Sequence, residues 1–245
     1  MKQSLKRFLK HFPDTYRLYS KIPPSLRFYL ERLFGTRLNE IIWATRPISA
    51  GKDYQKAEDD PHRKFLVEKI SNFSPTCILE IGCGTGLNLY LVSKRFPDAE
   101  LKGIDVNPNS VEYGNAWFKQ EGISNVKLSV GKADELEFKD KSFDVVFTDA
   151  VLIYIGPDKI KKLVKEMIRV AKKVLILNEW HCFEPTSNPL GVYVGHWARD
   201  YKTLLKEFVP EEKINVARIP EGTFNKDENW HKYGAVVEVL IKEIK

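Results

Sequence analysis

From residue 77 onward, short apolar runs alternate with stretches in which apolar and polar positions follow helical spacing. Each run is nearly continuous in apolar residues, which is typical of a strand buried on both faces. The stretches between the runs are long enough to cross over the sheet and lead into the next parallel strand. We therefore predict an α/β fold, a parallel sheet covered by helices on both faces. The predicted strands are residues 77–81, 101–105, 126–130, 143–148 and 174–178, and the predicted crossover helices are residues 88–96, 108–121 and 157–171.

The pattern changes beyond residue 180, where a loop rich in proline, glycine and aromatic residues begins. A helix is predicted around residues 198–208, followed by two β-like runs at residues 213–219 and 235–241. Parallel sheets in α/β proteins often carry antiparallel strands at an edge. We therefore expect the last two runs to pair antiparallel at one edge of the sheet.

The first 60 residues carry two amphipathic stripes and the chain's excess of positive charge. One stripe covers residues 3–12, and the second ends at Gly35. Residues 1–52 carry a net charge of +8, whereas the remaining 193 residues sum to −2. We predict a basic helical extension or lid, residues 1–60, attached to a nearly neutral domain, residues 61–245.

Composition narrows the class of protein. With 245 residues and 43% hydrophobic side chains, the chain can bury one large core. Its three cysteines show no C-x-x-C spacing, so neither disulfides nor a structural zinc site is suggested, and we expect no metal. No apolar run reaches the roughly 18 residues of a membrane span, and the first residues lack the apolar stretch of a secretory signal. We expect a soluble, cytoplasmic protein.

A glycine-rich turn follows the first predicted strand directly. Gly82, Gly84 and Gly86 join this strand to a helix. Glycine permits positive φ and removes the Cβ that would keep a ligand from the backbone amides. A dinucleotide fingerprint requires G-x-G-x-x-G, but Leu87 stands where its third glycine would fall. Nicotinamide or flavin binding is therefore disfavoured, and a purely structural tight turn is the remaining simple alternative.

This segment resembles the first motif of class I S-adenosylmethionine-dependent methyltransferases, a strand with an acidic residue followed by G-x-G-x-G. The resemblance covers roughly residues 77–180. It implies a Rossmann-like methyltransferase fold with a central, mostly parallel seven-stranded sheet, and S-adenosylmethionine as the cofactor. The residues that it assigns to the cofactor from this motif are Glu80, Gly82, Cys83, Gly84 and Gly86.

The resemblance assigns further cofactor contacts downstream. Asp105 ends the second predicted strand, where a carboxylate can accept hydrogen bonds from both ribose hydroxyls. Asp134 follows the third predicted strand, where family members contact adenine through a carboxylate and a neighbouring backbone amide. Helix capping is the simple alternative for both acids. The other implied contacts are Val106, Ala133, Thr148, Asp149 and, in the lid, Tyr54.

The sequence identifies the catalytic residues less clearly than the residues that bind the cofactor. Methyl transfer is an in-line displacement, so placement of the acceptor should matter most, and a general base is needed only if the acceptor must lose a proton. The candidates are His181, Glu179 and Tyr154, because they follow the fifth and fourth predicted strands, with His196 as a weaker fourth. Each also has an ordinary structural explanation in packing or hydrogen bonding. Aromatic residues near these positions suit an apolar or cationic acceptor.

The leading hypothesis is a methyltransferase that acts on a small molecule, a sugar or a lipid-linked glycan. The alternatives are an RNA or protein methyltransferase and a catalytically silent module that binds S-adenosylmethionine and interacts with a partner. The basic extension has three interpretations: a lid, a segment that contacts the inner membrane surface peripherally through residues 1–40, or a segment that binds nucleic acid. The last is disfavoured because the sequence contains no RNA-binding module.

Overall fold

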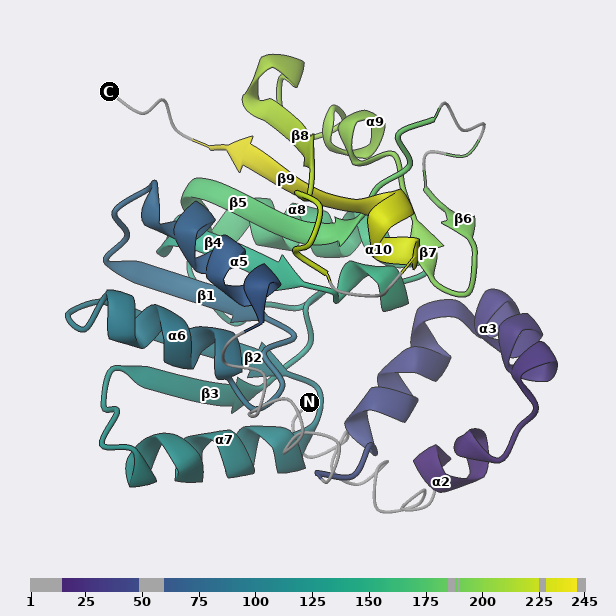
Figure 1. The fold of residues 1–245 in the computed structure, drawn as a ribbon, viewed down its shortest axis with the longest axis horizontal. Helices are drawn as coiled ribbons and strands as arrows, with labels where there is room; N and C mark the ends of the chain where they lie inside the picture. The colour runs from purple at the N-terminus through teal and green to yellow at the C-terminus, as the bar shows by residue number, and fades with distance from the viewer. Residues whose placement is uncertain (1–14, 49–59, 185–187, 189, 225–227, 242–245) are drawn as a thin grey trace.

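A computed structural model describes residues 15–48, 60–184, 188, 190–224 and 228–241. Its centre is a seven-stranded sheet in the order β3-β2-β1-β4-β5-β9-β8 (Figure 1). The pairings among β1 to β5 are parallel, and β9 pairs antiparallel with both β5 and β8, which confirms the predicted antiparallel edge. The strands are β1 Cys77–Ile81, β2 Glu100–Asp105, β3 Val126–Val130, β4 Phe143–Asp149, β5 Ala171–Trp180, β8 Ile214–Arg218 and β9 Gly234–Leu240.

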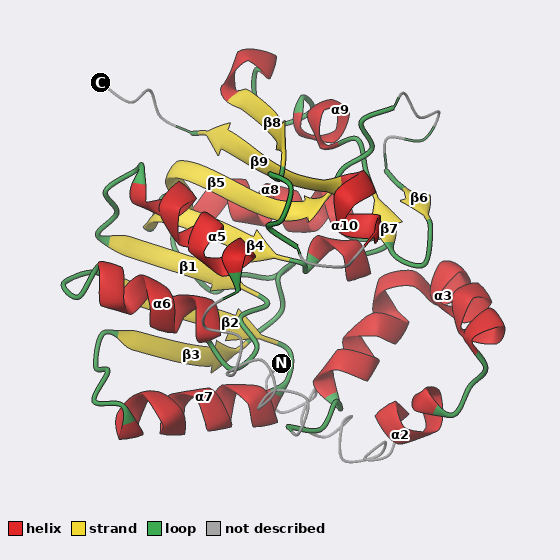
Figure 2. Ribbon diagram, in the orientation of Figure 1, coloured by secondary structure: helices red, strands yellow, loops and turns green. Residues whose placement is uncertain are grey.

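Neighbouring residues on each strand pack into opposite layers of helices. Leu79 and Val146 belong to the apolar cluster that includes α8, whereas Ile78 and Val145 belong to the cluster that includes α5, α6 and α7. Figure 2 shows α5 and α6 in front of the sheet and α8 behind it. Burial on both faces explains the continuous apolar runs and confirms the predicted layers. The helices are α5 Pro61–Ser71, α6 Leu87–Arg95, α7 Pro108–Gln120 and α8 Ile160–Val170.

Helix α8 begins three residues later than the predicted start at residue 157. The segment before it is a turn that tertiary contacts hold, because Gly156 N donates to Thr36 Oγ1 at 2.7 Å. Thr36 Oγ1 in turn donates to Asp158 Oδ1 at 2.7 Å. These contacts hold the chain against the N-terminal helices, so the first helical residue is Ile160.

The helix predicted around residues 198–208 is present but shorter than predicted. A small separate sheet, β6 Val192–Tyr193 and β7 Trp197–Ala198, precedes a short helix α9, Tyr201–Leu205. Trp197 and Ala198 are buried and pair antiparallel with β6, which overrides their helical spacing. Strand β5 also extends beyond the predicted residue 178 to Trp180, because β9 pairs with it over its whole second half.

The N-terminal segment forms α2, Thr15–Ser20, and the long helix α3, Pro24–Ala44, which lie beside the strand ends (Figure 1). The sequence predicted that the pattern ends at Gly35, but α3 continues beyond it through a kink where Gly35 has φ 50°. The second half of α3 buries Thr36 and Asn39, and these contacts stabilise the continuation. The first predicted stripe, residues 3–12, lies outside the described residues, among which no helix is long and apolar enough to span a bilayer.

Candidate functional site

A cavity of about 640 Å³ lies at the carboxyl ends of β1, β2 and β4. This volume is within the usual range of small-molecule sites, roughly 300 to 1,000 Å³. The glycine loop after β1, Asp105 at the end of β2 and Asp149 at the end of β4 line it. The second half of α3 forms another wall through Asn39 and Trp43. The position follows the rule that open α/β sheets bind ligands outside the carboxyl ends of their strands.

The three glycines of the loop are required for different reasons. All three have positive φ, which favours glycine. At Gly82 an added Cβ would lie 2.4 Å from a methyl carbon of Val151, and at Gly86 it would lie 2.7 Å from the ring of Phe118. At Gly84 an added Cβ would meet no described atom within 4 Å, and this residue lines the cavity. Gly84 is therefore the point where the backbone lies open to a ligand, and the other two glycines also serve packing.

Asp105 connects the end of β2 to the glycine loop. Its Oδ2 accepts a hydrogen bond from Gly84 N at 2.8 Å, and its Oδ1 accepts one from Asn107 N at 2.8 Å. Burial raises the pKa of the Asp105 carboxyl, although these backbone N–H groups oppose the shift. Each oxygen keeps a second lone pair, so the carboxylate can still accept hydrogen bonds from two ligand hydroxyls.

Asn107, which the sequence analysis did not single out, attaches the N-terminal segment to this end of the cavity. Its Oδ1 caps α7 by accepting from Asn109 N and Ser110 N. Its Nδ2 donates to the carbonyl oxygens of Trp43 and Arg46, each at 2.9 Å. The cap was recognisable from an asparagine before Pro108, but the link to α3 has no local signal.

Ion pairs connect α3 to the loop that follows β3. The carboxylate of Asp134 lies 3.4 Å from Lys162 Nζ and 3.7 Å from Lys159 Nζ. Glu40 on α3 contacts Lys159 and lies 3.3 Å from Lys132 Nζ. Asp134 is almost fully buried and lines the cavity, so its carboxylate faces both the ligand space and these lysines.

A buried polar network lies behind the glycine loop. Asn88 Nδ2 donates to Glu80 Oε1 at 2.7 Å and to Asp149 Oδ2 at 3.0 Å. Asn88 Oδ1 accepts from Arg63 Nη1 at 2.5 Å, and Asn178 Nδ2 donates to Asp149 Oδ1 at 2.7 Å. Burial raises the pKa of Glu80 well above its ordinary value. The sequence analysis missed the three partners; only Asn178, a polar residue in an apolar strand, offered a signal.

Glu179, a candidate base, is fully buried on β5. Its Oε1 accepts from Val151 N at 3.0 Å, and its Oε2 accepts from Leu152 N at 2.9 Å and from Ile153 N at 3.3 Å. Burial raises the pKa of Glu179 to about 7, against these backbone N–H groups. The carboxylate thus holds the start of the 3₁₀ helix η1, Leu152–Tyr154.

The other candidate bases lie in different surroundings. His181 Nδ1 accepts a hydrogen bond from Tyr201 N at 3.2 Å, and burial lowers the pKa of its imidazole. Tyr154 and His196 line the cavity, whereas the described lining includes neither His181 nor Glu179. The structure therefore brings Tyr154 and His196 together at the cavity, and it places His181 and Glu179 outside the described lining.

Most residues predicted to bind the cofactor share this cavity. Gly86 and Thr148 are exceptions in the described lining: Gly86 precedes α6, and Thr148 is fully buried in β4. Tyr54 lies outside the described residues. The predicted residues that line the cavity are Glu80, Gly82, Cys83, Gly84, Asp105, Val106, Ala133, Asp134 and Asp149.

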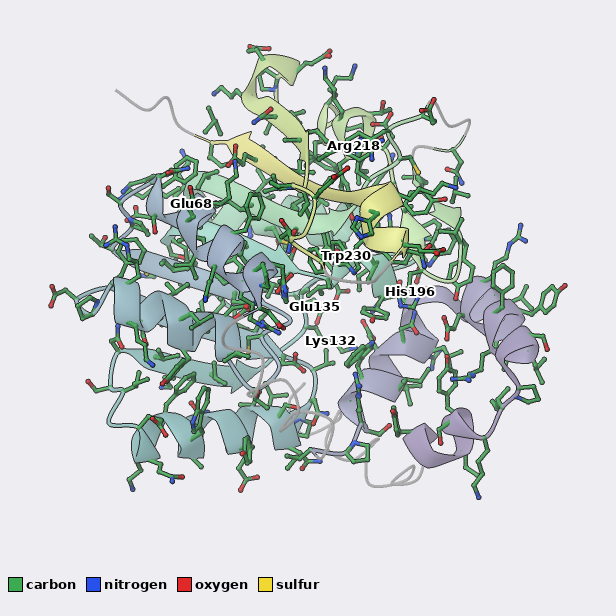
Figure 3. The ribbon with its side chains drawn as sticks, in the orientation of Figure 1. Glu68, Lys132, Glu135, His196, Arg218 and Trp230 are labelled. Atoms are coloured by element: carbon green, nitrogen blue, oxygen red, sulfur yellow. The ribbon has the colours of Figure 1, made fainter. Side chains whose placement is uncertain are left out.

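Aromatic and imidazole rings form a large part of the remaining cavity lining, here called the ring wall. Figure 3 shows two of them, His196 and Trp230, in the same region near α10, Glu228–Tyr233. The sequence analysis named His196 and Tyr154 but missed His62, Phe224 and Trp230, which no motif connects. The ring wall comprises Trp43, His62, Tyr154, Trp180, His196, Phe224 and Trp230.

The cofactor end has groups that fit S-adenosylmethionine. The open backbone at Gly84 admits a close ligand, and the Asp105 carboxylate suits vicinal hydroxyls. Glu80 Oε2 is buried without a hydrogen-bond partner among the described residues, so it can accept from an amino group. The residues present therefore fit the cofactor that the sequence motif implies.

Comparison with known proteins agrees with this geometry. Residues 78–174 match a family model described as a methyltransferase domain. The chain is 32% identical over 167 residues to demethylmenaquinone methyltransferase of Staphylococcus aureus (strain JH9), which covers 66% of each chain. It is 33% identical over 129 residues to norajmaline N-methyltransferase of Rauvolfia serpentina, which covers 52% of this chain and 40% of that relative. The chain thus spans well under half the length of that relative.

A solved structure shows the same fold. An S-adenosylmethionine-dependent methyltransferase from Aquifex aeolicus matches with a TM-score of 0.52 and 23% identity, over 78% of this chain and 98% of that one. The strand order, the glycine loop and these similarities agree with one another. The chain belongs to the class I, Rossmann-like methyltransferases, a family of enzymes whose cofactor is S-adenosylmethionine.

Proposed function

We propose that this protein transfers the methyl group of S-adenosylmethionine to a small molecule bound against the ring wall. The observation that carries the proposal is that the glycine loop, Asp105 and the ring wall line one continuous cavity. When bound, the cofactor supplies a methyl carbon attached to a positively charged sulfur. The relatives' names include norajmaline and demethylmenaquinone, which supports an acceptor of small-molecule size.

The chain's own contribution is to bind and orient the two reactants and to exclude water. We infer that residues 1–60 act as a lid, because the second half of α3 bonds directly to the cavity wall. Thr36 Oγ1 donates to Asp158 Oδ1 at 2.7 Å, and Asn39 Nδ2 donates to Tyr154 O at 2.9 Å. Each contact joins α3 to the segment between β4 and α8.

The competing functions make different demands on this cavity. An RNA or protein methyltransferase must also hold a polymer outside the cavity, whereas a small molecule needs only the space that α3 and the ring wall line. A catalytically silent module that binds S-adenosylmethionine needs no cavity volume beyond that which the cofactor fills. A screen for S-adenosylhomocysteine release with small-molecule, sugar, peptide and RNA acceptors separates these functions. Turnover with a small molecule alone is the expected result, and turnover with RNA or peptide alone would overturn the proposed acceptor class.

Calorimetric titration with S-adenosylmethionine tests the cofactor site. Gly84→Val and Asp105→Ala should each abolish saturable binding, because the first fills the open backbone position and the second removes the carboxylate. Gly122→Val is the matched control: Gly122 also has positive φ and no described atom near an added Cβ, but it lies outside the described cavity lining. A folded wild-type protein that does not bind the cofactor would contradict the proposal.

We also infer a contact with an anionic membrane through the first half of α3, at the inner surface of the membrane. Leu26, Tyr29 and Leu33 are among the large apolar side chains most exposed in the described residues, and they lie at helical spacing on one face. The positive charge of the N-terminal segment complements anionic headgroups, and a lipid-linked acceptor would suit this location.

Sedimentation with phosphatidylserine vesicles tests the membrane contact. Leu26→Ser with Leu33→Ser should weaken the binding severalfold without changing cofactor affinity, because both side chains point to solvent. Equal vesicle binding by the wild type and this double variant would refute the contact.

A further inference from the structure

The rings of the ring wall form an unbroken series of contacts. Successive ring centroids lie 3.9 to 6.1 Å apart, within the range of aromatic pairing. The order is His62, Phe224, Trp230, Trp180, His196, Tyr154 and Trp43.

These rings come from segments far apart in the sequence. Trp43 belongs to α3, His62 to α5 and Trp180 to the end of β5. His196 lies in the turn between β6 and β7, and Trp230 lies on α10. Their shared property is that all line the cavity, so their ring surfaces border ligand space as well as one another. Planar ring surfaces of this kind suit a flat, unsaturated ligand.

One contact of His196 favours the tautomer that carries its hydrogen on Nδ1. Nδ1 of His196 contacts the carbonyl oxygen of Gly195. A carbonyl oxygen can only accept, so this contact suits the tautomer with the hydrogen on Nδ1 and a lone pair on Nε2. The ring wall therefore contains a nitrogen that can take a proton from a bound molecule.

The acidic groups of the cavity are engaged away from His196. Glu40 pairs with Lys132 and Lys159, and Asp149 accepts from the amides of Asn88 and Asn178. An aromatic cage for a cation gains from a carboxylate near the rings. Asp149 Oδ2 lies 3.7 Å from Nε2 of the ring-wall residue His62, but among the described residues no ion pair or hydrogen bond joins a cavity carboxylate to His196. An amine in its neutral form also needs no base before it attacks a methyl group, whereas a hydroxyl does. The presence of a basic imidazole thus favours a hydroxyl acceptor.

We propose that the ring wall binds a planar aromatic acceptor bearing a phenol-like hydroxyl, and that Nε2 of His196 accepts its proton. The proton leaves the acceptor oxygen for His196, and this oxygen forms a bond to the methyl carbon as the carbon–sulfur bond breaks. The sulfur leaves as the neutral thioether of S-adenosylhomocysteine, and the imidazolium then returns the proton to solvent. This inference rests on the proposed function and names its acceptor class.

A binding experiment with 4-nitrophenol tests the planar site without turnover. The probe is titrated into wild-type protein, with and without saturating S-adenosylhomocysteine, while tryptophan fluorescence reports occupancy. Trp230→Leu should weaken the binding at least tenfold by removing a stacking surface. Trp117→Leu is the matched control, because Trp117 stacks on Tyr90 and Phe118 and is absent from the described cavity lining.

The same probe reports proton transfer, because the 4-nitrophenolate anion absorbs visible light and the neutral phenol does not. On binding to wild-type protein at a pH just below the probe's own pKa, the anion absorbance should rise. At probe concentrations that saturate each protein, His196→Asn should lose most of this rise per molecule of bound probe. His231→Asn, which alters an exposed imidazole on α10, should behave as wild type.

The outcomes separate this inference from the proposed function. No saturable probe binding, equal binding by Trp230→Leu, or an undiminished absorbance rise in His196→Asn would overturn the ring-wall proposal, even if S-adenosylmethionine binds normally. Displacement of the probe by tetramethylammonium at similar concentration would also overturn it, in favour of a cationic acceptor. Loss of S-adenosylmethionine binding in the wild type would instead contradict the proposed function, while the probe titration without cofactor still tests the ring wall.

Discussion

The two ends of the cavity are built in different ways. At the cofactor end, the contacting groups are backbone atoms and carboxylates at the ends of adjacent strands, such as Gly84 and Asp105, which are joined by a hydrogen bond of 2.8 Å. At the ring wall, the contacting groups are side chains such as Trp43 and Phe224, which the chain brings together from distant segments. The fold itself therefore dictates the first end, whereas tertiary packing of connecting segments dictates the second.

The largest expected effect concerns the buried support of the cofactor end. Arg63→Ala should lower the free energy of unfolding by about 3 to 5 kcal/mol, because it removes the buried cation beside Asp149 and the donor to Asn88 Oδ1. Urea denaturation measures this loss. Arg95→Ala, an exposed arginine on α6, serves as the control and should change stability by under about 0.5 kcal/mol. If Arg63→Ala also lost under about 0.5 kcal/mol of unfolding free energy, the buried polar network would not support the cofactor end.

Glu179 connects the two ends, because it holds the turn that carries Tyr154. Its pKa is about 7 in the folded protein against an ordinary value of 4.5, so the folded state keeps a proton that the unfolded state releases. Stability should therefore fall as pH rises from about 4.5 to 7, by roughly 3 kcal/mol at 1.36 kcal/mol per pKa unit.

Urea midpoints of wild type and Glu179→Gln between pH 4.5 and 8 test this dependence. The variant should lose clearly less stability over this range than the wild type, because glutamine does not titrate. Parallel curves for the two proteins would contradict the raised pKa.

A smaller effect is expected for Asp105→Asn, which should lower affinity at the cofactor end but leave the ring wall unchanged. The amide keeps one acceptor oxygen, but its NH₂ group faces the N–H of Gly84 or Asn107, so cofactor affinity should fall by about 1.5 to 3 kcal/mol. Binding of 4-nitrophenol in the absence of cofactor should not change, because the Asp105 carboxylate accepts from the backbone of Gly84 and Asn107 rather than contacting a ring. Calorimetry and fluorescence measure the two affinities, and a parallel loss of both would show that the ends are not independent.

The smallest effect is expected at the kink of α3. Gly35→Ala should cost about 1 kcal/mol, because φ is 50° there and an added Cβ would lie 3.1 Å from Asp158 Oδ1. Gly122→Ala, at another positive φ with open surroundings, separates backbone strain from the crowding at Asp158. Thermal unfolding measures both variants. A stability gain in Gly35→Ala would refute the strained kink.

The sequence predicted the part of the fold that its own periodicity determines. Strands such as Cys77–Ile81 are buried on both faces, and their apolar runs predicted them correctly. The glycine loop was recognisable because one backbone geometry needs glycine at set positions. Ala198 misled the prediction of a helix start, since only pairing with β6 makes it part of a strand. Arg63 and Phe224 reach the site through tertiary contacts, for which no local pattern exists.

The hairpin that carries His196 has a consequence for how acceptor choice can change over generations. β6 and β7 form a sheet of their own, outside the seven-stranded one. Phe224 and Trp230 likewise lie in the connection between β8 and β9. Insertions, deletions or exchanges in these connections leave the strand register and the glycine loop in place. Arg199 is fully buried and donates to the carbonyl oxygens of Leu152 and Ile155, so chimeras should exchange only residues 190–196 between relatives to test whether the proposed acceptor end can diverge by loop replacement.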